Sequence, residues 1–253
     1  MNKLTEVSPD RQARLRALRR QIVQAASLTT HWEEVAPLGI AGVDACLNGG
    51  VATGALHEVA AADHRSTPAS IGFLLALITL LSGTLKSFIL WPFTKAASAF
   101  GVPYAPGLKF FGLDPARIVF VRCTNARECL WVMEEGLRLG GIGIVIGTRA
   151  KKMDLTASRR LHLAAEQAHM PVLLLRSYND GSPSAAVTRW RISPAPSAHD
   201  EFGFYKNARF HVALEYARSG KTGEWEMEWD HGAISLRLSS ELGDRAAGEN
   251  PAA

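Results

Sequence analysis

The chain has 253 residues, 47% hydrophobic and 21% charged, a composition typical of a folded globular protein that excludes wholesale disorder, a collagen and a disulfide-knotted miniprotein. Its net charge of +4 permits an acidic partner such as nucleic acid but does not require one. The three cysteines have no CxxC spacing, so they indicate neither a disulfide framework nor a structural zinc site, and they favour a reducing compartment.

The first predicted element is a basic amphipathic helix over residues 8–25, with apolar side chains on one face and arginines on the others. We expect it to pack on the core or on a neighbouring molecule; the alternative is a contact with a protein partner or nucleic acid. Its candidate partner-binding residues are Arg16, Arg19 and Arg20. Because charges stand where a signal peptide needs an apolar region, and the apolar stretch 71–81 is too short to span a bilayer, we expect a cytoplasmic protein without membrane contact.

From about residue 38 the sequence becomes apolar and glycine-punctuated, and strands alternate with helices. We expect strands at 55–60, 86–91, 117–122, 141–147 and 171–177, and helices at 70–82, 126–139 and 156–169. Uninterrupted apolar strands such as IGIVIG and PVLLL are typical of a parallel sheet that is covered on both faces. The predicted fold class is therefore α/β, a doubly wound, mostly parallel sheet flanked by helices.

After the loop YNDGSPSAA the pattern changes to alternating β-strands, VTRWRIS and then RFHVALEYARSGKTGEWEMEWDHGAISLRL, with a hairpin turn at 219–223. We expect these C-terminal strands to extend one edge of the sheet antiparallel. The tail has no periodicity and is expected to be disordered. The predicted organisation is a basic helix and linker at 1–37, an α/β core at 38–198, a β-hairpin extension at 199–240 and the tail at 241–253.

The first strand, loop and helix of the core have the layout of a phosphate-binding loop without its residues. The stretch 60–70, AAADHRSTPAS, contains neither the glycines nor the lysine of GxxxxGK[ST], and Pro68 removes an amide donor. No Asp or Glu occurs from 82 to 113, and Asp154 comes too late after its strand to hold magnesium. The HExxH and GxSxG motifs are absent as well. We therefore predict no catalytic residues, no metal and no cofactor, and a protein that is not an enzyme.

Three segments carry a family resemblance: LGIAGVDACLNGGVATGALHEV, DLTASRRLHLAAEQ and GKTGEWEMEWDH. With them the chain, from about Leu38 to His231, resembles the ImuA family of RecA-like inducible-mutagenesis proteins. The resemblance implies a RecA-like core with a degenerate Walker A motif and a role as accessory protein of the bacterial SOS response. It further implies error-prone translesion synthesis with an ImuB-like partner and an error-prone polymerase, the C-terminal part meeting ImuB. Contact with RecA, weak DNA binding and self-association remain open.

The RecA-like fold implied by this resemblance places DNA at the loops after the fourth and fifth core strands, here 148–155 and 178–187. Basic residues in and beside them could neutralise phosphates, and the alternative is a solvated basic face. The candidate DNA-binding residues are Arg149, Lys151, Lys152, Arg159, Arg160 and Arg176. Tyr178 could stack on a base or serve packing.

In the hairpin, tryptophans alternate with glutamates, so we expect one aromatic and one acidic face. The aromatic face covers either the core or a partner. The candidate partner-binding residues here are Glu224, Trp225, Glu226 and Trp229. The alternative function is a cell-division inhibitor resembling SulA that binds FtsZ; a nucleotide-dependent enzyme or recombinase is a third hypothesis, which the missing catalytic groups disfavour.

Overall fold

A computed structural model describes residues 34–83, 87–95, 104–148, 153–199, 201–203 and 206–239. The predicted N-terminal helix with Arg16, Arg19 and Arg20, and the predicted tail, lie outside the described residues. Among the described residues, no helix is long and apolar enough to span a membrane.

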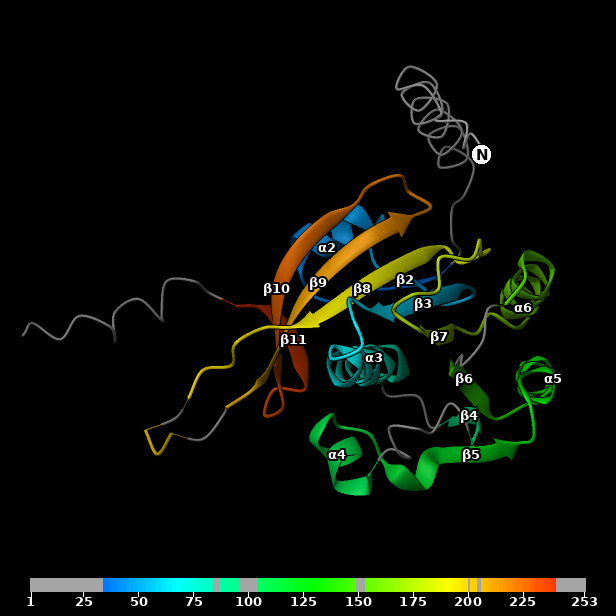
Figure 1. Cartoon of the computed structure of the whole chain (residues 1–253), viewed down its shortest axis with the longest axis horizontal. Coiled ribbons are helices and arrows are strands. Elements are labelled where there is room, and N and C mark those ends of the chain that lie inside the picture. Colours follow the sequence, from blue (N-terminus) through cyan, green and yellow to red (C-terminus); the bar gives the residue numbers. More distant parts are fainter. Residues whose placement is uncertain are drawn as a thin grey trace, which may run out of the picture.

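A nine-stranded sheet forms the centre of the molecule (Figure 1). Its order is β11-β10-β9-β8-β3-β7-β6-β4-β5, in which the six strands from β8 to β5 run parallel and β9, β10 and β11 continue antiparallel. The strands are β3 Leu56–Ala61, β4 Phe88–Thr94, β5 Ile118–Cys123, β6 Ile142–Thr148, β7 Val172–Arg176, β8 Thr188–Pro194, β9 Ala208–Ala217, β10 Gly223–Asp230 and β11 Ser235–Leu238. The predicted fold class, with antiparallel strands extending one edge, is confirmed. The expectation that VTRWRIS is one of the antiparallel strands is wrong, because this segment forms β8 and pairs parallel with β3, and the antiparallel extension begins with β9.

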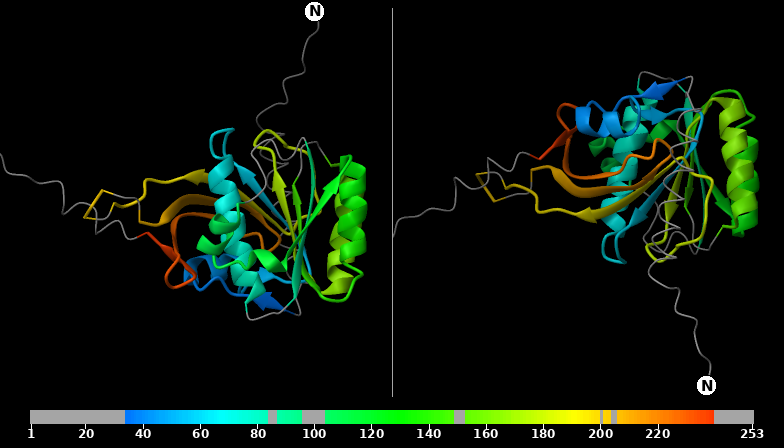
Figure 2. Two further views of the ribbon diagram at one scale, coloured as in Figure 1. Left: turned by 90° about the horizontal axis from the view of Figure 1, so that it is seen from below. Right: turned by 90° about the horizontal axis from the view of Figure 1, so that it is seen from above.

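Helices cover both faces of the parallel half (Figure 2). The helices are α2 Ala41–Cys46, α3 Thr67–Ser82, α4 Ala105–Phe110, α5 Ala126–Gly136 and α6 Leu155–Ala168, with a 3-10 turn at Pro115–Arg117 and a small sheet of β1 Val35–Ala36 and β2 Val51–Ala52. Along β6, Ile144 and Ile146 pack in the cluster around α3, whereas Val145 packs in the cluster beneath α5 and α6. This two-sided burial explains why the parallel strands are apolar without interruption.

The antiparallel strands complete the burial of α3. This helix, TPASIGFLLALITLLS, is apolar on nearly all sides, and a helix of that kind has to be covered all round. Phe73 in α3 lies 5.7 Å from Trp190 of β8 and 6.1 Å from Phe210 of β9, measured between ring centroids. Trp229 of β10 and Leu236 of β11 belong to the same buried cluster. The C-terminal strands are therefore part of the core that α3 requires.

Two proline positions move the element boundaries from those expected. Helix α3 begins at Thr67, three residues before the predicted start, because Pro68 fits the first helical turn, where an amide needs no partner. Strand β4 continues through Pro92 to Thr94. It pairs with β6 only as far as Leu90 and beyond that with β5 alone, so Pro92 stands where one side of the hydrogen-bond ladder has ended.

Candidate functional site

The turn between β3 and α3 stands where a phosphate-binding loop would be. The Asp63 carboxylate accepts hydrogen bonds from the Ser66 amide and the Ser66 hydroxyl, both at 2.8 Å. These bonds, the hydroxyl first, lower the pKa of Asp63 below its ordinary value, so the group is an anion at neutral pH. The chain thus places its own negative charge at the start of α3, where a nucleotide phosphate would need amide donors.

The carboxyl ends of β4 and β6 carry hydroxyl and indole groups. The indole nitrogen of Trp91 donates to the Thr148 hydroxyl at 3.0 Å, which ties the ends of these two strands together. Thr94 is the last residue of β4 and Thr148 the last of β6, so within the described residues neither strand ends in a carboxylate. No cluster of three or more potential metal ligands occurs among the described residues either.

A buried ionic network lies beside this turn on the face that carries α6. Glu58 in β3 accepts from Arg176 Nη1 at 2.5 Å and from Arg189 Nε at 3.2 Å. The side chains of Glu58 and Arg176 are 0% and 1% exposed. Burial lowers the pKa of Arg176, but the charges of Glu58 and Asp180 outweigh it, and the net shift is upward.

Arg176 also fixes the segment that follows β7. Its Nη2 donates to the carbonyl oxygens of Asp180 at 2.6 Å and Ser182 at 3.0 Å, and lies 3.0 Å from the Asp180 carboxylate. The segment then reaches α6, where the Ala185 amide donates to the Ser158 hydroxyl at 3.1 Å. The candidate DNA contact at Arg176 does not fit this position, because its guanidinium is buried and engaged in holding the loop.

The other DNA-binding candidates are divided between α6 and residues outside the description. Arg159 and Arg160 are exposed on the first half of α6, and Arg160 pairs with Glu134 of α5 at 2.6 Å. Tyr178 is 43% exposed, with its ring 6.3 Å from that of His64. Arg149, Lys151 and Lys152 lie outside the described residues.

The two faces of the hairpin differ as expected. Trp229 is fully buried, stacks on Phe111 at 5.6 Å and donates from its indole nitrogen to the Phe110 carbonyl at 3.3 Å. Trp225 is partly buried against the same core. The aromatic face therefore covers the core, and Trp229 is not available to a partner in this fold. Glu224 and Glu226 are exposed on the opposite face.

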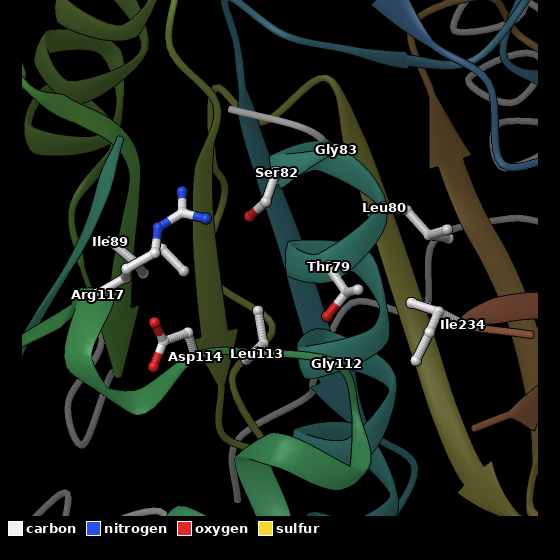
Figure 3. Close-up of a pocket in the computed structure, with 10 residues that line it drawn as sticks. All are labelled: Thr79, Leu80, Ser82, Gly83, Ile89, Gly112, Leu113, Asp114, Arg117 and Ile234. Atoms are coloured by element: carbon white, nitrogen blue, oxygen red, sulfur yellow. The ribbon is translucent and has the colours of Figure 1, made fainter. Parts of the chain in front are cut away.

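One pocket, of about 270 Å³, lies at the amino ends of the strands, between the last turn of α3 and the segment before β5 (Figure 3). This is not the edge of the sheet at which α/β proteins usually bind ligands, which is the edge formed by the carboxyl ends of the strands. The charged residues that line this pocket are Asp114 and Arg117, which have opposite charges. The Arg117 guanidinium donates to the Ser87 carbonyl at 2.5 Å, and Asp114 caps the turn before β5, so both groups hold the chain itself. This pocket carries no functional assignment.

A second pocket, of about 360 Å³, lies between α6, the segment before β8 and the end of β9. It is lined by Leu155, Arg159, His162, Leu163, Ser184, Ala185, Ala186, Tyr216 and Arg218. Tyr216 and Arg218 were not predicted from the sequence, because β9 contains a bulge that changes the side of the sheet on which they lie.

The role of Glu58 in the buried ionic network was not predicted either, although a glutamate within the apolar strand LHEVAA was a visible signal of buried charge pairing.

A search of protein-family models finds no match. Two curated proteins do match, both called Protein ImuA, from Caulobacter vibrioides strains NA1000 / CB15N and ATCC 19089 / CIP 103742 / CB 15. Each is 34% identical over 228 residues, which cover 83% of this chain and 91% of the relative. Identity at this level over nearly the whole relative matches the family that the three sequence segments indicated. The chain belongs to the ImuA family.

Proposed function

We propose that this protein is a non-catalytic, RecA-like accessory protein of the SOS response that supports error-prone translesion synthesis by binding an ImuB-like partner and an error-prone polymerase. The observation that carries the proposal is the family membership, at 34% identity over 83% of the chain. The turn at Asp63 supports the non-catalytic part, because its carboxylate takes the hydrogen bonds that a phosphate would need. A carboxylate there also repels a nucleotide phosphate.

For partner binding, the polar face of the hairpin is our proposed surface. Helices α5 and α6 pack over β3, β4, β6 and β7, and the same side of β10 carries Glu224 and Glu226, both exposed. Glu228 on this face is already engaged by Arg209 at 2.6 Å and by Asn207 at 2.7 Å. Glu224 lies 3.7 Å from His211 Nε2 but its side chain stays 70% exposed, and Glu226 is exposed as well, so both glutamates present acidic charge to a basic patch on a partner.

Co-purification from DNA-damaged cells tests the proposal. The tag belongs at the N-terminus, so that the hairpin stays accessible, and retained proteins are identified by mass spectrometry. We expect an ImuB-like protein or a polymerase subunit to be retained. The double variant Glu224→Lys/Glu226→Lys should weaken retention at least about tenfold. Glu166→Lys, the same reversal at an exposed position of α6, is the matched control and should retain the partner.

Two results would reject this function. The first is damage-induced mutation that stays unchanged when the protein is deleted. The second is retention of FtsZ without any polymerase, which would assign the chain to the alternative of a division inhibitor.

A further inference from the structure

We propose that the pocket between α6 and the end of β9 binds a phosphate group. It is lined by two guanidinium groups, an imidazole, a phenol and a hydroxyl, and no carboxylate is among its lining residues. Guanidinium groups recognise phosphate through two parallel charge-assisted hydrogen bonds. The composition therefore favours an oxyanion. The pocket at the amino ends of the strands lacks this character, because Asp114 offsets Arg117 there.

The arginines reach the pocket from two different elements. Arg159 is exposed on α6, and no carboxylate among the described residues pairs with it. Arg218 follows the last residue of β9 directly, and its amide donates to the Val187 carbonyl at 2.8 Å. An anion between the two walls is therefore met by positive charge from both sides.

A β-bulge places Tyr216 and Arg218 on this side of the sheet. In β9 the residues Phe210, Val212 and Leu214 face the α3 core, and strict alternation would put residue 216 there too. The register shifts, however: Trp190 pairs with Leu214 and Arg189 with Tyr216, which leaves one extra residue in β9. Ala217 returns to the α3 core, so Tyr216 and Arg218 lie on the face of α6. Bulges commonly redirect side chains in this way beside binding sites.

The base of the pocket is formed by His162, which is 6% exposed. Its Nδ1 accepts from the Leu56 amide at 3.4 Å, so the neutral ring carries its proton on Nε2 and is a donor there. Burial first, and then the charge of Arg218, lower the pKa of His162, while Glu166 acts in the opposite direction. A bound phosphate would offset the effect of Arg218 and raise this pKa.

The backbone wall of the pocket is rigidly held. Residues 184–186 are fixed to α6 through Ser158 and Ala185, and the preceding residues are fixed by Arg176. Leu163, 54% exposed, and Tyr216, 36% exposed, form an apolar and aromatic rim. Such a rim suits the sugar and base that accompany a phosphate in a nucleic-acid strand.

The test uses the full chain and two phosphate sources. Binding of a fluorescein-labelled dT15 oligonucleotide is followed by anisotropy in 50 mM NaCl, and binding of inorganic pyrophosphate by calorimetry. We expect Arg159→Ala and Arg218→Ala each to weaken the affinity for the probe that binds about tenfold. Arg127→Ala, an exposed arginine on α5, is the matched control and should change affinity less than twofold. Arg159→Lys keeps the charge and should lose less than Arg159→Ala.

The outcomes are distinct. Pocket-dependent binding of dT15 that pyrophosphate does not displace identifies a nucleic-acid strand as the source of the phosphate. Pocket-dependent binding of pyrophosphate identifies a small phosphate compound. If neither probe binds, or if Arg127→Ala weakens binding as much as Arg159→Ala, the site does not exist. Arg159 is exposed, so its variants test the site without unfolding the chain. Co-purification of the ImuB-like partner is measured separately, and its result does not depend on this pocket.

Discussion

The buried pair of Glu58 and Arg176 makes Glu58→Leu a severe perturbation. The substitution removes the nearest counter-charge of a guanidinium whose side chain is 1% exposed. Breaking a buried ion pair from one side costs about 3–5 kcal/mol. Because Asp180 stays 3.0 Å from Arg176, we expect the lower end, about 3 kcal/mol. In a domain of this size that corresponds to a fall in Tm of roughly 6–12 °C.

A double-mutant cycle measured by calorimetry tests this reasoning. The variants are Glu58→Leu, Arg176→Met and the two together. With both charges gone, Arg189, 28% exposed, can turn toward solvent, and the Asp180 carboxylate, 5% exposed, loses Arg176 but still accepts from the Ser182 amide and hydroxyl. The double variant should therefore lose less stability than the sum of the two single losses. The control is Glu135→Gln, which breaks the exposed pair with Arg138 and should cost less than about 1 kcal/mol. A Glu58→Leu loss as small as that control, or strictly additive single losses, would refute the account.

Three further predictions concern the core and its titrating groups. Trp229→Ala should cost about 3–5 kcal/mol in urea unfolding, because Trp229 is fully buried, whereas Glu226→Ala should change stability by less than about 0.5 kcal/mol; equal midpoints would contradict the burial. Burial lowers the pKa of His57 to about 4, so on acidification the imidazole is protonated in the unfolded chain at a higher pH than in the folded protein. Up to about 3 kcal/mol of stability that is present above pH 6.5 is therefore lost as the pH falls toward 4. The difference between the urea midpoints at pH 7.5 and pH 5 should therefore be smaller in His57→Gln than in the unsubstituted protein. A difference of the same size in both proteins would assign the loss of stability to other groups. A thiol reagent such as DTNB should label half-buried Cys46 in the native protein and the two buried cysteines only on unfolding, because burial raises the pKa of Cys129 to about 12; three thiols reacting at one rate would contradict this.

The candidate site could be predicted from the sequence only where it depends on residue type. The missing glycines and lysine of 60–70 were visible in the sequence, whereas the capture of Ser66 by Asp63 depends on the conformation of the turn. Arg176 stood beside a predicted loop and so was proposed to contact DNA. Its pairing with Glu58, 118 residues away in the chain, was decided by the parallel register of β3 and β7.

The sequence by itself determined the fold class, because uninterrupted apolar strands that alternate with helices bury both faces of a parallel sheet. It also determined the antiparallel extension, since period-two alternation around 219–223 is unambiguous. Only the tertiary structure decided that the extension completes the burial of α3, and that one extra residue in β9 turns Tyr216 and Arg218 toward α6. Alternation is a local property of the chain, but a bulge arises from the mismatch between two paired strands, and no single strand carries that information.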